Sequence, residues 1–229
     1  MMPMPRPSAD RRTRAARAAA VLLLAAVAAA GFAAPAGAAT ANATATTTAA
    51  TTATTDGPSA WTLDRLMSTL ARHRSGHATF VETKYLSIAS QPIESSGELV
   101  FVAPDHLEKR TVSPKPENLV VDGDRVTIER NGHRYTLALE QYPEVAGFIE
   151  SIRATLAGDR YALERLYEVA VAGHGDDWTL TLTPRDARMR NTIGTITLDG
   201  VRDRLRTVTI READGDRSVM RLHRVSAAG

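Results

Sequence analysis

Apolar and polar residues alternate along most of the chain, as expected for β-strands that bury one face. Val126 and Ile128 share one face of such a run, Leu137 and Leu139 share another, and Trp178, Leu180 and Leu182 form a third. The other predicted strands are residues 78–88, 99–102, 107–112, 118–121, 169–171, 193–198, 205–210 and 219–225. The pattern therefore predicts about ten strands.

Glycine-containing turns punctuate these runs. The first three, Asp122-Gly123-Asp124, Asn131-Gly132 and Asp199-Gly200, lie between alternating segments and predict β-hairpins. A fourth turn is predicted at Asp214-Gly215-Asp216. Short turns join antiparallel strands, and a sheet of this size curls or closes.

Two segments have helical periodicity instead. Residues 61–74 predict an amphipathic helix with Thr62 as its cap. Residues 143–167 form a helical insert that begins at Pro143, is interrupted at Gly158 and resumes at 161–165. Its apolar stripe consists of Phe148, Ile149, Ile152 and Leu156. The pattern therefore predicts a mainly β fold, in which an antiparallel sheet of about ten strands curls or closes and the helical insert forms a flap.

Residues 1–38 have the features of a secretory signal peptide. Several arginines precede an apolar run over 18–30, and Ala36-Gly37-Ala38 fits a cleavage site. The alternative is an uncleaved membrane anchor. We expect a flexible Thr/Ala-rich linker over 39–58 and one folded domain over 59–229. These signals predict cleavage near Ala38 and export from the cytoplasm.

The net charge is different when residues 1–38, the predicted leader, are left out. Because the leader holds five of the 28 basic residues and one of the 26 acidic residues, the remainder has 23 and 25, a net charge of −2. This argues against a nucleic-acid partner. The sequence has no cysteine, which excludes disulfides, thiol catalysis and lipid attachment through an N-terminal cysteine. We therefore expect a freely soluble mature protein.

The ordered segments resemble the LolA-like periplasmic lipoprotein carriers over about 63–222. The resemblance is carried by Thr79-Phe80-Val81-Glu82-Thr83-Lys84, by Gly97-Glu98-Leu99 through Ala103-Pro104, and by Ser113-Pro114 through Asp122-Gly123. Gly175-Asp176-Asp177-Trp178 through Leu182-Thr183-Pro184 adds a fourth segment. Two positions depart from the family pattern. Ala103 replaces the arginine that latches the lid, and Leu107-Glu108-Lys109 replaces a Phe-x-Trp docking segment.

The resemblance implies an incomplete antiparallel β-barrel of about 10–11 strands, covered by short helices that form a lid. It also implies a monomeric periplasmic carrier whose barrel cavity takes acyl chains. Its expected partners are an acylated lipoprotein or other lipid cargo, an inner-membrane donor complex and an outer-membrane acceptor. Lys109 and Arg110 are candidates for contact with an anionic head group, or else a solvated strand pair. The residues expected to line the cavity and lid, or alternatively to be ordinary core, are Leu99, Phe101, Leu137, Leu139, Phe148, Ile149, Ile152, Leu156, Trp178 and Leu180.

Other functions remain open at this point. A barrel-fold hydrolase or isomerase would need converging titratable groups, for which His106, Glu108 and His133 are the candidates. A non-transporting envelope assembly factor is the third possibility. The Asp-Gly-Asp triplets are more typical of turns than of calcium loops, and the six histidines lack zinc-ligand spacing. No metal and no cofactor are expected.

Overall fold

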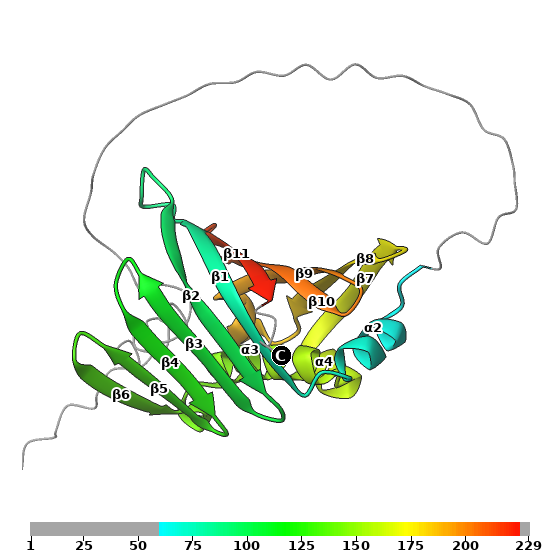
Figure 1. Ribbon diagram of the computed structural model, residues 1–229, viewed down its shortest axis with the longest axis horizontal. Coiled ribbons are helices and arrows are strands. Elements are labelled where there is room, and N and C mark those ends of the chain that lie inside the picture. The colour runs from blue at the N-terminus through cyan, green and yellow to red at the C-terminus, as the bar shows by residue number, and fades with distance from the viewer. Residues whose placement is uncertain (1–59, 225–229) are drawn as a thin grey trace, which may run out of the picture.

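The computed structural model describes residues 60–224, so the predicted signal peptide and the predicted linker lie outside the described part (Figure 1). The helical elements are α2 (Leu63–Leu70), η1 (Leu139–Gln141), α3 (Pro143–Ala157), α4 (Arg160–Leu166) and α5 (Ala187–Arg190). The strands are β1 (Ser75–Tyr85), β2 (Ile93–Val102), β3 (His106–Ser113), β4 (Glu117–Asp122), β5 (Arg125–Arg130), β6 (His133–Ala138), β7 (Tyr167–His174), β8 (Asp177–Pro184), β9 (Ile193–Val201), β10 (Arg204–Glu212) and β11 (Arg217–Arg224).

All eleven strands form one antiparallel sheet, in the order β6-β5-β4-β3-β2-β1-β11-β10-β9-β8-β7. Every neighbouring pair is consecutive in sequence except β1 and β11, which pair at the centre. The edge strands β6 and β7 do not pair with each other. The expected incomplete antiparallel barrel with helices is confirmed.

The helical insert connects the two edges of this sheet. After β6 the chain runs through η1, α3 and α4 before it enters β7 at the opposite edge. Figure 1 shows the helices gathered towards one end of the strands, away from the tip of the β1–β2 hairpin. Connecting the edges therefore places the helices over the open side of the sheet.

Three of the four predicted glycine turns are confirmed. Gly123, Gly132 and Gly215 lie in the β4–β5, β5–β6 and β10–β11 turns, each at positive φ. The β9–β10 hairpin predicted at Asp199-Gly200 also forms, but its turn is displaced, because β9 continues to Val201 and the chain reverses around Arg202.

Gly200 has a different role from the one predicted. A side chain there would overlap the indole ring of Trp178, which packs on the glycine from the neighbouring strand. The residue therefore permits close packing rather than a turn.

The predicted helices form with the predicted caps, but the first is shorter than predicted: α2 ends at Leu70 and not at 74. Thr62 Oγ1 accepts a hydrogen bond from the Arg65 amide at 3.2 Å and caps α2. Gly158 ends α3 in the left-handed conformation. Helix α5, whose first turn is capped by Asp186, was not predicted from the sequence.

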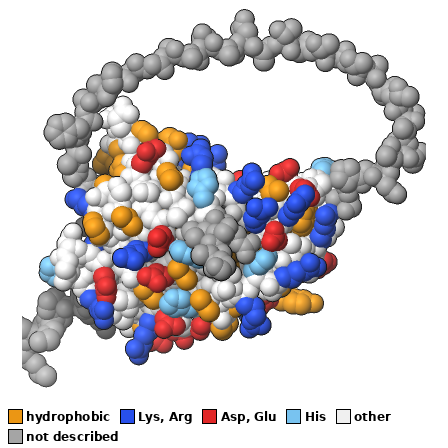
Figure 2. Space-filling model, in the orientation of Figure 1, with side chains coloured by type: hydrophobic (Ala, Val, Ile, Leu, Met, Phe, Trp, Pro, Cys, Tyr) orange, Lys and Arg blue, Asp and Glu red, His pale blue; other side chains and the backbone are white. Residues whose placement is uncertain are grey.

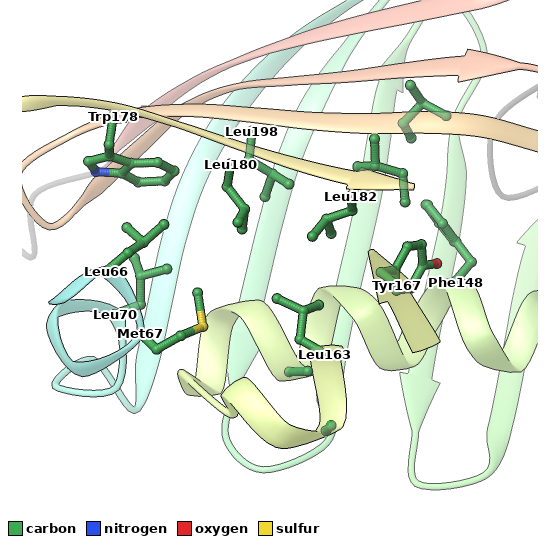
Figure 3. Packing of buried hydrophobic residues seen from close by; sticks show 14 of the residues in the cluster. Leu66, Met67, Leu70, Phe148, Leu163, Tyr167, Trp178, Leu180, Leu182 and Leu198 are labelled. Atoms are coloured by element: carbon green, nitrogen blue, oxygen red, sulfur yellow. The ribbon is translucent and has the colours of Figure 1, made fainter. Parts of the chain in front are cut away.

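The core consists of two apolar clusters. The larger one, shown in Figure 3, joins strands β7 to β10 to α2, α3, α4 and α5. Its labelled residues point from the strands and from the helices towards one another. The smaller cluster joins β4 and β5 to η1 and α3. Helix α3 contributes to both and ties the two halves of the sheet together.

One face of the molecule carries a mixture of side-chain types. Figure 2 shows basic, acidic and hydrophobic side chains interspersed on the visible surface, without a continuous patch of one kind. Within residues 60–224, no helix combines the length and the hydrophobicity needed to cross a membrane.

Candidate functional site

The helix-side face of the sheet, defined here as the face on which α3 packs, is the candidate site. Val121, Val126 and Ile128 of β4 and β5 contact the helix residues Val145 and Ile149 in one cluster. Because side chains alternate along strands, Glu117 and Leu119 lie on the same face as Val121. The same alternation places Phe80, Glu82 and Lys84 on this face of β1.

Helix α3 covers the apolar end of this face. Phe148 belongs to the larger cluster, Ile149 to the smaller one, and half-buried Ile152 packs against the larger. Leu156 is half-buried and belongs to neither cluster. The predicted apolar stripe thus divides between the two halves of the sheet.

The other candidate lining residues are distributed over the same face. Trp178 and Leu180 lie in the larger cluster, whereas Leu137 and Leu139 lie in the smaller one. Leu99 and buried Phe101 are on β2, between the clusters. The structure therefore brings these residues to one face but not into one contiguous cluster.

Trp178 is held at one end of the core. Its indole Nε1–H donates to the Arg202 carbonyl at 2.9 Å, and its ring lies 6.4 Å from that of Trp61, tilted by 60°. The packing of this ring against Gly200 leaves it 2% exposed. In this conformation Trp178 is core.

Arg153 on α3, a residue that no sequence pattern indicated, connects this helix to turns of the sheet. Arg153 Nη2 on α3 donates to the carbonyls of Asp105, at 2.7 Å, and Gly123, at 2.6 Å. These carbonyls belong to the turns that precede β3 and β5. The family latch position, Ala103, lies beside the first turn and makes a backbone hydrogen bond to Arg74 O at 2.8 Å. An arginine on the helix thus holds backbone oxygens of the sheet.

Lys109 and Arg110 point to opposite faces, because they are adjacent on β3. Arg110 is exposed. Lys109 lies on the helix-side face, where its Nζ is 2.7 Å from Glu82 Oε2 and 5.1 Å from the ring centroid of Phe80. The structure therefore does not bring the two cations together.

The far end of the helix-side face is charged. The Glu82 side chain is only 1% exposed, and it accepts hydrogen bonds from Ser218 at 2.6 Å and Ser95 at 3.4 Å in addition to Lys109. Burial alone would raise the pKa of Glu82, but Lys109 and Lys84 outweigh burial and hold it below its usual range. Glu82 is therefore a buried, ionised acceptor.

Lys84 is the second cation at Glu82. Its Nζ lies 3.8 Å from Glu82 Oε1, and its side chain is 12% exposed. Burial lowers the pKa of Lys84 to about 8, although Glu82 opposes this shift. The side chain is therefore mostly buried, and its ammonium lies beyond hydrogen-bond distance of Glu82.

The charged end continues across the sheet. The Glu117 carboxylate lies 4.0 Å from Arg130 Nη1, and burial raises its pKa. An open depression of about 450 Å³, lined in part by Thr111, Glu117 and Arg130, lies between the β3–β4 loop and the β5–β6 turn. On the other side of β1, burial and two neighbouring aspartates raise the pKa of Glu212 to about 7.

The sequence contains one signal for this charged end. Phe80, Glu82 and Lys84 follow one another at the strand period, so they had to share a face with an apolar residue. Arg153 had no comparable signal, because its partners are backbone carbonyls of distant turns.

The candidate catalytic residues do not converge. His106 begins β3 beside Val102, whereas His133 begins β6 at the level of Arg130, Glu117 and Thr111. The two histidines are separated by three strand positions in the sheet and by roughly five residues of strand length, more than 15 Å. Among the described residues, no group of three or more carboxylate or histidine side chains could hold a metal ion.

Comparison with known proteins agrees with this architecture. The sequence matches the family model described as "Outer membrane lipoprotein carrier protein LolA-like" over residues 55–228. No curated protein matches the sequence.

Solved structures with a similar arrangement share little sequence with this chain. A LolA superfamily protein from Nitrosomonas europaea is 11% identical, with 74% of this chain and 96% of that chain covered and a TM-score of 0.38. A putative outer membrane lipoprotein-sorting protein domain from Vibrio parahaemolyticus is 11% identical, with coverages of 73% and 93% and a TM-score of 0.38. In the Pseudomonas aeruginosa MucA/MucB complex, the matching chain is 19% identical, with coverages of 73% and 57% and a TM-score of 0.38.

The family model spans every residue that the structure describes, which confirms the resemblance read from the sequence motifs. The protein belongs to the LolA-like family of outer-membrane lipoprotein carrier proteins.

Proposed function

We propose that this protein is a periplasmic carrier that binds the acyl chains of a lipoprotein or related lipid on the helix-side face and passes them towards the outer membrane. The observation that carries the proposal is the position of α3. Its apolar residues Phe148 and Ile149 enter separate clusters, so lifting this one helix would open both halves of the face.

The strength of acyl burial explains why such a protein needs no chemistry of its own. Each buried methylene is worth about 0.8 kcal/mol, so one long acyl chain contributes roughly 10 kcal/mol. Release into water would be very slow. Cargo would therefore pass by direct contact, from an inner-membrane donor to an outer-membrane acceptor.

The proposal includes an export step. Residues 1–38 would be removed near Ala38, residues 39–58 would form a linker, and 59–229 would act as a soluble, monomeric carrier domain without cofactor or catalysis. Residues 1–59 and 225–229 lie outside the described residues.

The first test uses protein exported from cells that express the full chain. Its N-terminus is expected near Ala39, and mass spectrometry of an organic extract is expected to find stoichiometric acylated molecules. Protein that retains Met1 in the membrane fraction would contradict the export step. A lipid-free extract, together with no binding of a fluorescent fatty acid, would contradict the carrier.

The second test separates a lid from an ordinary core helix. Ile152→Asp places a charge where α3 meets the larger cluster, so it should weaken acyl-probe binding at least tenfold while lowering the melting temperature by only a few degrees. Ile88→Asp is the matched control, since Ile88 is 93% exposed.

Fluorescence titration and thermal unfolding of both variants give the comparison. If Ile152→Asp lowers affinity no more than its loss of folded protein explains, α3 is core and the lid is wrong. If Ile88→Asp loses affinity equally, the effect is not specific to α3.

A further inference from the structure

Lysine is rare in this chain, and its distribution is uneven. The three lysines are Lys84, Lys109 and Lys115, against 25 arginines. Lys115 is exposed, whereas Lys84 and Lys109 approach the same buried carboxylate from β1 and β3. The charged end of the helix-side face thus holds two compact cations in a protein that otherwise uses arginine.

The two ammonium groups are not satisfied equally. Lys109 donates to Glu82 at 2.7 Å. Lys84 Nζ lies 3.8 Å from Glu82 Oε1, beyond hydrogen-bond distance, and the charges of Glu212 and Glu117 also act on it. An ammonium group has three N–H donors, and Lys84 Nζ is not a fully buried unpartnered atom, so its donors are open to water or to a ligand.

The two ammonium groups share one close counter-charge. A partly buried charge is stabilised by close, hydrogen-bonded counter-charges, and among the described residues only Glu82 has a carboxylate within 4 Å of either ammonium, with Glu117 and Glu212 further away. Ser95 and Ser218 compete for the same carboxylate, since both donate to Glu82. A negatively charged oxygen acceptor from a ligand would therefore find free N–H donors here.

The neighbouring surface indicates what carries that acceptor. Phe80 precedes Glu82 on the same face of β1, and its ring lies 5.1 Å from Lys109 Nζ. Beyond it, the face becomes apolar and is covered by α3. An amphiphile could therefore place its head at the lysines and its chain along the apolar end.

We propose that Lys84 and Lys109 form a binding site for the anionic head group, a carboxylate or phosphate, of the acylated ligand. Glu82 holds the two cations apart and in place. This inference rests on the proposed carrier function and specifies the chemistry of its ligand.

A matched pair of probes tests the site at pH 7. A fluorescent long-chain fatty acid and its methyl ester share a chain and differ by one negative charge. The wild type should bind the acid about tenfold more tightly than the ester. Lys84→Met keeps the aliphatic stem and should remove most of that tenfold preference, while affinity for the ester stays unchanged.

Two further variants keep the result interpretable. Lys115→Met is the control, because it removes the exposed third lysine and should leave the preference intact. Glu82→Gln removes the internal competitor for both ammonium groups and should increase the preference for the acid. Thermal unfolding of each variant identifies those that do not fold.

The outcomes distinguish the two proposals. Equal binding of acid and ester in the wild type, or an unchanged preference in folded Lys84→Met, would overturn the anionic site but leave the acyl carrier standing. Binding of neither probe would contradict both. Displacement of the fatty acid by millimolar inorganic phosphate alone would mean that the lysines hold a free anion, which would overturn the head-group assignment.

Discussion

At the scale of single residues, glycine has two unrelated roles in this fold. Gly132 occupies a hairpin turn with φ of 73°, which other residues rarely adopt. Gly200 is inside a strand, where its missing side chain makes room for the ring of Trp178. Both occur in sequences that look like turns, so only the neighbouring strand distinguishes them.

We expect Gly200→Ala to destabilise the protein by about 1–3 kcal/mol, because the methyl group would overpack the core against Trp178. Gly76→Ala is the control: Gly76 is also in a strand, but a side chain there meets nothing within 4 Å. Chemical denaturation of both variants measures the difference. Equal stability of the two would show that both the indole ring and the Arg204 carbonyl, which a side chain here would also meet, move aside freely.

At the scale of elements, α3 is attached by side chains rather than by backbone pairing. Its apolar residues enter two clusters, and Arg153 joins it to the turns before β3 and β5. Each hydrogen bond from a charged donor contributes about 1.5–3 kcal/mol. The arginine therefore fixes the helix at one point on the sheet.

Replacing Arg153 by methionine should loosen α3 selectively. We expect a fall in stability of about 1–3 kcal/mol, faster amide hydrogen exchange in α3 and faster uptake of a fatty-acid probe, while β8 and β9 retain their protection. Arg165→Met is the control, since Arg165 is an exposed arginine on the neighbouring helix α4.

Hydrogen exchange followed by mass spectrometry, with stopped-flow uptake, checks this expectation. Unchanged exchange in α3 would mean that the two clusters alone hold the helix. Faster exchange throughout the sheet would mean that Arg153 stabilises the whole fold and is not a latch.

At the scale of the whole molecule, the charged end of the sheet links stability to pH. Glu212 is the clearest case, because burial, Asp214 and Asp216 raise its pKa to about 7, with Lys84 opposing them. Between pH 4.5 and 7, the folded protein then binds more protons at this site than the unfolded chain does. The contribution of Glu212 to the free energy of unfolding therefore falls as the pH rises through this range.

Glu212→Gln should remove that contribution. The variant should gain stability relative to the wild type as the pH rises from 5 to 8, because glutamine imitates the protonated acid at every pH. Glu94→Gln, at an exposed position, provides the reference. The check is the free energy of unfolding of each variant and of the wild type, measured at several pH values. A difference between Glu212→Gln and wild type that does not change with pH would contradict the raised pKa of Glu212.

The sequence by itself determined the elements and their order. The alternating runs predict the strands, Gly123 and Gly132 mark two hairpins, and Thr62 and Gly158 cap helices where the structure has them. These signals succeed because each depends on local backbone geometry: the strand period, positive φ, or a cap within one turn of helix. The ordered motifs also indicated the family.

Only the tertiary structure decided which side chains meet. Gly200 is explained by a ring from the adjacent strand, Arg153 by carbonyls 48 and 30 residues away, and the Glu82 cluster by contacts with Lys109 and Ser218. Strand pairing between the chain's two ends, β1 with β11, creates part of that cluster. Such contacts depend on register and sheet curvature, which arise from the packing of the whole chain and leave no pattern at any one position.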